Sequence, residues 1–210
     1  MGEEKSQAET WELVGERLSL DFANTVDWPV GEDTQARLDA YNTLVAWGAY
    51  TGALPEDRVQ ALRQRAAREP DAAASVVERA VALRQALRTI VQAVIDGRAP
   101  SAEALQAVNQ EVARVMPHLR LAPHDGGFHW HWEEDGSALD AMLWPVVHDA
   151  AELLTASASL ERVKQCDGST CTWLFLDTSR NRSRRWCSME SCGNRAKARR
   201  YYRRQKNESD

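Results

Sequence analysis

The sequence has no long hydrophobic run and no apolar or basic leader. Its longest apolar stretch, residues 141–147, covers seven residues and contains Pro145, whereas a membrane-spanning helix needs about 20 apolar residues. Residues 1–10 are acidic and polar, unlike the basic and then apolar start of a secretory signal. We therefore expect a protein that does not span a membrane and that stays in the cytoplasm.

The sequence also lacks the common catalytic signatures. It contains no GxSxG, GxGxxG, HExxH or Walker A motif, and these motifs carry the chemistry of many hydrolases, dinucleotide enzymes, metalloproteases and ATPases. His148 has no evident nucleophile that it would activate. We therefore expect that the protein is not an enzyme.

Charge is divided unevenly along the 210 residues. Residues 1–179 hold 15 Lys and Arg against 28 Asp and Glu, a net charge of −13, while residues 180–206 hold 11 against one, a net charge of +10. An acidic body with a strongly basic end favours binding of a polyanion at that end. The alternative is that the basic end docks on an acidic surface, either of the body or of another protein.

Cysteine is absent except from one short segment. All four cysteines lie within 27 residues, in the pattern C-x4-C-x15-C-x4-C. They are Cys166, Cys171, Cys187 and Cys192. Two pairs of thiolates suit a tetrahedral zinc ion, and four sulfur ligands leave no open position for catalysis. The spacing predicts one structural Zn²⁺ per chain, and oxidation of the same thiols with release of zinc stays open as a form of regulation.

Helical periodicity dominates the rest of the chain. Apolar residues recur at intervals of three and four, which is typical of amphipathic helices. The expected helices cover residues 34–52, 55–66, 71–96, 101–117 and 137–157, the last one kinked at Pro145. Residues 128–132 alternate aromatic residues with histidines and follow a turn at residues 124–127, so residues 118–132 are expected to form a half-buried hairpin. Residues 11–26 are expected to form a short hairpin, or a strand that enters a helix.

The cysteine-containing segment has its own expected order of elements. A tight loop joins the first two cysteines, residues 173–177 and 185–187 have strand composition, and residues 178–184 form a polar turn. Ser188 is expected to cap a helix that places Cys192 at its start and continues as a basic helix over residues 194–206. This order predicts a treble-clef-like zinc finger. The fold class is therefore α+β and mainly helical, with a body of residues 1–158 and a finger of residues 159–210.

Two motifs resemble a known pair of domains. Cys192-Gly193-Asn194-Arg195 spells the motif of the CGNR zinc finger, and the sequence around it is similar to that family over its whole length. The segment LDFANT at residues 20–25, with residues 41–48, resembles the ABATE domain of stress-induced transcription regulators. The resemblance implies a bacterial transcription regulator with a zinc-binding and DNA-binding C-terminal module. We expect residues 1–158 to form a sensor or scaffold domain.

The basic residues of the finger supply many candidate nucleic-acid contacts. Arg outnumbers Lys by nine to two in residues 180–206, which suits bidentate contacts with phosphate or guanine. The candidates are Arg180, Arg182, Arg184, Arg185, Asn194, Arg195, Lys197, Arg199, Arg200, Arg203 and Arg204. DNA and RNA are not separated, because Tyr201 and Tyr202 suit either base stacking or packing.

Other candidate sites are weaker. Asp21, Asn24, Asp27 and Trp28 suit a small-molecule site in the body, although capping and turn roles explain the same residues. The histidines of residues 124–131 fit an exposed polar face better than a second metal site, because further ligands are missing. One small finger gives modest specificity, which favours a homodimer, although no coiled-coil segment demands one.

Overall fold

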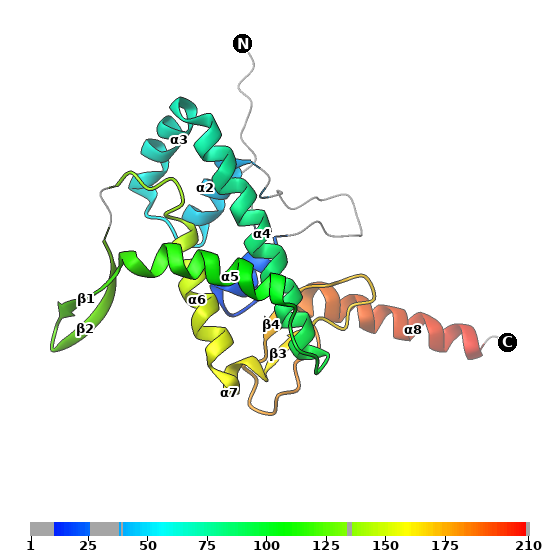
Figure 1. Ribbon diagram of the computed structural model, residues 1–210. Helices are drawn as coiled ribbons and strands as arrows, with labels where there is room; N and C mark the ends of the chain where they lie inside the picture. The colour runs from blue at the N-terminus through cyan, green and yellow to red at the C-terminus, as the bar shows by residue number, and fades with distance from the viewer. Residues whose placement is uncertain (1–10, 26–37, 39, 134–135, 209–210) are drawn as a thin grey trace, which may run out of the picture.

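The computed structural model describes residues 11–25, 38, 40–133 and 136–208. Within these ranges the chain forms a helical body, from which a β-hairpin and the C-terminal helix project in different directions (Figure 1). Its two sheets are both two-stranded and antiparallel, with the strand orders β1-β2 and β3-β4. The expected mainly helical α+β fold is confirmed. No helix in these ranges is long and apolar enough to cross a membrane.

Seven α-helices of the described residues build the body. They are α1 (Leu18–Ala23), α2 (Tyr41–Tyr50), α3 (Val59–Arg68), α4 (Pro70–Ile95), α5 (Ala102–Val115), α6 (Leu143–Thr155) and α7 (Ser157–Leu160). Short 3-10 turns at Glu56–Arg58 and Met116–His118 precede α3 and follow α5. The longest helix, α4, packs against α1, α2, α3 and α5, so it is the central helix of the body.

The starts of α4 and α5 follow from the sequence. Pro70 occupies the first turn of α4, where its missing N–H has no helical partner to lose. Ser101 precedes α5, and its side chain accepts a hydrogen bond from the Ala104 N–H at 3.2 Å. These are the boundaries that the residue types predict.

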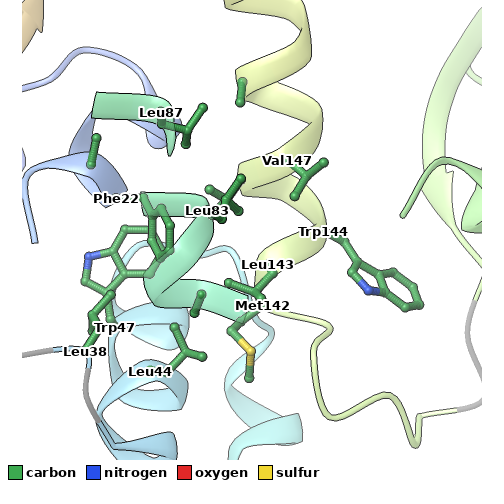
Figure 2. Packing of buried hydrophobic residues seen from close by; sticks show 14 of the residues in the cluster. Phe22, Leu38, Leu44, Trp47, Leu83, Leu87, Met142, Leu143, Trp144 and Val147 are labelled. Atoms are coloured by element: carbon green, nitrogen blue, oxygen red, sulfur yellow. The ribbon is translucent and has the colours of Figure 1, made fainter. Parts of the chain in front are cut away.

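The core of the body lies where α1, α2, α4 and α6 meet. Figure 2 shows Phe22 and Trp47 side by side, next to leucines of α4, and the two rings meet edge-on at 5.4 Å between centroids. The residues before α6 approach α2 closely, because a Cβ on Gly48 would lie 2.7 Å from the Met142 Cβ. A glycine at residue 48 is therefore required by packing.

Trp144 points away from this cluster and serves another contact (Figure 2). Its ring stacks on His118 at 4.2 Å and meets Trp132 at 5.7 Å between centroids. These contacts attach the base of the β1-β2 hairpin to α6. The hairpin consists of β1 (Leu119–His124) and β2 (Gly127–Trp132).

Three expectations about these elements are wrong. Residues 18–23 form a helix instead of a strand, because Ser19, Leu20, Phe22 and Ala23 bury one helical face. Pro145 does not kink α6, since the helix begins only at Leu143 and its first turn tolerates proline. The hairpin is not half-buried: Trp132 is its one partly buried aromatic residue.

Candidate metal centre and basic helix

The finger begins with a hairpin that carries the first two cysteines in its loop. Strands β3 (Val163–Gln165) and β4 (Leu174–Leu176) pair antiparallel, and Cys166 and Cys171 lie between them. The chain then turns through residues 177–186 to the π-helix η3 (Met189–Gly193) and α8 (Asn194–Glu208). The strand expected at residues 185–187 is absent from the described structure, because the Arg184 and Cys187 N–H groups donate to Asp177 and to a cysteine sulfur instead.

The second pair of cysteines is held by a capped helix start, as the sequence predicts. Ser188 precedes η3 and its Oγ accepts a hydrogen bond from the Ser191 N–H at 3.3 Å. Cys192 lies inside η3 and is buried. The metal-site candidate and the basic helix α8 are therefore parts of one continuous segment.

The sulfur atoms of the four cysteines converge on one point. They lie within 4.8 Å of one another and all four residues are buried. Cys187 Sγ is 3.7 Å from both Cys171 Sγ and Cys192 Sγ. A tetrahedral zinc ion with Zn–S bonds of about 2.3 Å places its sulfur ligands about 3.8 Å apart. The sulfur set therefore fits one structural Zn²⁺.

Backbone N–H groups surround the sulfurs. Cys166 Sγ accepts from the Gly168 and Cys187 N–H groups at 3.4 and 3.3 Å, and Cys171 Sγ accepts from the Trp173 N–H at 3.5 Å. Such donors stabilise thiolate charge around a metal. Gly168 is essential to the arrangement, because a Cβ there would lie 3.0 Å from the Cys192 sulfur.

The cysteine thiols lie close enough together to shift one another's pKa values. Hydrogen bonds from the Cys171 and Cys187 thiols lower the pKa of Cys166 to about 2, whereas the hydrogen bond with Cys166 raises the pKa of Cys171 and of Cys187 above the usual range. Zinc takes its cysteine ligands as thiolates, so a bound ion would favour the deprotonated form of all four.

A buried carboxylate and one arginine hold the turn between the two cysteine pairs. Asp177 is fully buried and accepts from Lys164 Nζ at 2.6 Å and from the Arg184 N–H at 3.1 Å. Burial alone would raise the pKa of Asp177, but the hydrogen bonds from Lys164 and Ser179 hold it well below the usual range.

The Arg184 side chain is engaged inside the protein. Its guanidinium donates to the backbone carbonyls of Val14 and Cys187 at 2.9 and 2.6 Å, and to Glu16 at 2.9 Å. It also lies over the Phe175 ring at 4.5 Å. Although its sequence context predicts a nucleic-acid contact, Arg184 joins the finger to the segment before α1.

The finger packs tightly on the body. The Asn24 side chain, at the end of α1, donates to the Leu174 carbonyl and accepts from the Leu174 N–H, each at 2.8 Å. The Leu176 N–H donates to the Gly15 carbonyl at 2.9 Å. Leu174 itself belongs to the main core. Body and finger therefore share hydrogen bonds and apolar contacts.

The predicted ligand residues of the body have internal partners. Asp21 Oδ1 accepts from the Gly15 N–H at 2.8 Å, and burial raises the pKa of Asp21 to about 6. Asn24 is buried and bound to Leu174 as described above. Asp27 and Trp28 lie outside the described residues. The structure gives Asp21 and Asn24 roles in joining segments, and ligand binding there stays a prediction.

Another part of the body offers a cleft. It has a volume of about 460 Å³ and lies along the second half of α4, lined by Arg88, Gln92, Arg98, Ser101 and Leu174, among others. The Arg88 guanidinium donates to the carbonyls of Ala23 and Thr172 at 3.2 and 3.1 Å. Burial and the neighbouring Arg84 charge lower the pKa of Arg88. Periodicity did not single out Arg88, because it falls between the core positions of α4.

The predicted basic residues divide into engaged and exposed groups. Arg185 pairs with Asp167 at 2.7 Å, and Asn194 donates to the Glu190 carbonyl at 3.2 Å. One Arg195 nitrogen lies 3.6 Å from the Cys192 sulfur. The exposed group, with no carboxylate partner among the described residues, comprises Arg180, Arg182, Lys197, Arg199, Arg200 and Arg203. Arg204 belongs to α8, and its side chain lies outside the described part.

Helix α8 projects from the body into solvent (Figure 1). Arg195, Arg199 and Arg203 recur every four residues, and Arg200 lies beside them, so these four residues span an arc of about 140° on the helix. Exposure of this arc argues against the alternative in which the basic helix docks on its own acidic body.

Comparison with known families agrees with the geometry. Residues 16–157 match the family described as "Putative stress-induced transcription regulator", ABATE, and residues 162–205 match the CGNR zinc finger. A search of curated proteins finds no significant match. The first match covers more than half of the chain, and the second contains all four cysteines. The chain therefore belongs to the ABATE family and carries a C-terminal CGNR zinc finger.

Proposed function

We propose that this protein is a zinc-dependent, DNA-binding transcription regulator. Residues 159–210 are the DNA-binding module, residues 1–158 are the sensor and scaffold, and Cys166, Cys171, Cys187 and Cys192 hold the zinc. The observation that carries the proposal is the exposed arginine arc of α8, which begins directly after the buried Cys192.

In this proposal the zinc ion has a structural role. The ion would join the β3-β4 loop to η3 and so fix the direction in which α8 leaves the body. A segment of this size has too little core to hold that geometry without a metal. Arg195 would offset part of the negative charge of the four-thiolate centre, since it lies beside Cys192.

The contacts with DNA come from the exposed cations. Arg199, Arg200 and Arg203 occupy one arc of α8, Lys197 flanks it, and an arginine fork pairs bidentately with phosphate or with the guanine edge. Arg180 and Arg182, in the turn of the finger, add phosphate contacts. Arg184 is a structural residue in this scheme, because its donors are engaged with the body.

A small anionic ligand of the cleft along α4 is the signal that fits this arrangement. Arg88 lies in the cleft with no carboxylate partner among the described residues, and it also donates to Thr172, next to Cys171. A bound carboxylate or phosphate would draw the guanidinium away from that carbonyl. Titration of ¹⁵N-labelled, zinc-loaded protein with succinate or inorganic phosphate should shift the Gln92 side-chain and Thr172 backbone signals, and the Arg88→Gln variant should not respond.

Charge reversal on α8 tests the DNA-binding role. The variant Arg199→Glu/Arg203→Glu should bind random duplex DNA about 100-fold more weakly at low salt and keep its zinc and its melting temperature. The matched control is Arg63→Glu/Arg68→Glu, which makes the same change at exposed positions of α3 and should bind like the wild type. Equal binding by both variants would contradict the proposal.

RNA is the second candidate ligand. Tyr201 and Tyr202 are 58% and 68% exposed on α8, and exposed aromatic rings stack on unpaired bases. Duplex RNA and single strands therefore belong in the same binding series. A preference for a single strand that is lost on Tyr202→Ala would favour RNA, whereas the absence of any nucleic-acid binding would favour a protein partner for α8.

A further inference from the structure

The β1-β2 hairpin has one apolar face and one polar face. The register pairs Leu119 with Trp132, Leu121 with Trp130, and Pro123 with Phe128, so all six side chains lie on the same face. The opposite face carries Arg120 and three histidines. The two faces are therefore as distinct as those of a sheet that covers a core.

Most of the apolar face has nothing packed on it within the described structure. Leu121, Phe128 and Trp130 are 62%, 77% and 54% exposed. The base of the face is anchored on α6, where Trp132 meets Trp144 and His148 and the Trp130 ring meets His148 edge-on at 6.1 Å between centroids. In Figure 1 the outer part of the hairpin extends away from the helices.

The exposed area is large for a small hairpin. Full exposure of a large apolar side chain corresponds to roughly 150–250 Å², so Leu121, Phe128 and Trp130 together present about 350 Å². Single exposed apolar residues are ordinary, whereas a contiguous patch of this size is comparable to the largest patch of a typical monomer, and such patches are often functional. A two-stranded hairpin alone is also only marginally stable in water. Both facts indicate that this face is covered in the functional state.

We propose that the apolar hairpin face docks on the same face of a second copy of this chain. Residues 119–132 contain one arginine and one aspartate as their charged residues at neutral pH, within a segment of 179 residues whose net charge is −13. Two such acidic bodies repel each other, and this neutral face is where they meet with the least repulsion. A two-fold axis brings identical apolar ladders together and interdigitates their rings.

The area sets the strength of the dimer. Two copies would hide roughly 700 Å² at Leu121, Phe128 and Trp130 alone, whereas stable interfaces bury about 1,200–2,000 Å² in total. The flanking Leu119 and Pro123 and the unpaired strand edges of the two-stranded sheet add to the contact. Because this area is below that of a standard stable interface, we expect a concentration-dependent dimer, and this dimer does not depend on the DNA-binding role.

Sedimentation velocity of the full-length, zinc-loaded protein tests this surface. Wild-type protein is compared with Leu121→Ser/Phe128→Ser, over concentrations from about 1 to 200 µM. The matched control is His129→Ser, which changes the other face of the same strand. Each sample is run at about 0.1 and 0.5 M NaCl, because salt screens charge contacts and leaves apolar contacts in place.

The expected result is a wild-type dimer that persists at high salt. The double variant should dimerise at least about 100-fold more weakly, and His129→Ser should behave as the wild type. A wild-type chain that is monomeric throughout would overturn the proposal. So would a dimer that the double variant leaves intact, or one that high salt dissociates, since the latter would point to α8 binding the acidic body of another copy.

Discussion

Replacing Asn24 by alanine should lower the free energy of unfolding of the body and the finger together. Asn24 is 2% exposed and bonds both the N–H and the carbonyl of Leu174 at 2.8 Å. Alanine would leave both backbone groups buried without these partners. Each unsatisfied group costs about 1–3 kcal/mol, so the free energy of unfolding should fall by about 2–6 kcal/mol.

Because the contact between Asn24 and Leu174 joins the body to the finger, we expect the two parts to unfold cooperatively. Leu174 belongs to the same core as Trp47, so loss of the Asn24 bridge should shift unfolding of both parts together. Urea denaturation followed by tryptophan fluorescence gives the free energy, and zinc release followed with a chromogenic chelator reports on the finger. Asn109→Ala, at an exposed position of α5, is the control. Zinc release that precedes body unfolding by a wide margin, or a change under about 0.5 kcal/mol, would refute the reasoning.

Three further changes test the metal centre and the body. Cys187→Ser should abolish stoichiometric zinc, measured by elemental analysis of the purified protein; full zinc retention would remove Cys187 from the ligand set. Gly168→Ala should weaken zinc binding at least about tenfold in a chelator competition, because the new Cβ would lie 3.0 Å from the Cys192 sulfur, whereas Gly127→Ala, with its nearest atom at 3.9 Å, should not. Burial, with Glu16 and Asp149 nearby, raises the pKa of Asp21 from 3.8 to about 6. The folded state therefore loses stability as pH rises from about 4 to 6, because the carboxylate ionises more readily in the unfolded chain. The stability of Asp21→Asn relative to wild type should therefore grow by about 1 kcal/mol between pH 5 and pH 7.5 in urea denaturation, and a constant difference would show that Asp21 is not buried in this way.

Periodicity and cysteine spacing predict much of this structure. The long helix α4 and the capped start of α5 follow from apolar spacing, Pro70 and Ser101. The convergence of the cysteines follows from their paired spacing. These features are local, because each depends on residues close together in the chain.

Features that depend on distant contacts were missed. Residues 18–23 alternate like a strand but form a helix, because the helical form buries Ser19, Leu20, Phe22 and Ala23 on one face against other elements of the body. Arg184 has the same sequence context as the exposed arginines, and its contacts with Val14 and Glu16, about 170 positions away in the chain, give it a structural role that the sequence does not indicate. The outward position of Phe128 also could not be derived from alternation, which shows that two faces differ but not whether either is covered.

The direct test of the central claim is duplex DNA binding across a salt series, with and without a zinc chelator. The exposed cations Arg180, Arg182, Lys197, Arg199, Arg200 and Arg203 would neutralise about six phosphates, which gives a slope near −5 for log affinity against log salt. We expect this slope with the zinc-loaded protein and loss of binding on chelation. Binding that survives removal of zinc, or no salt-dependent binding at all, would contradict the account.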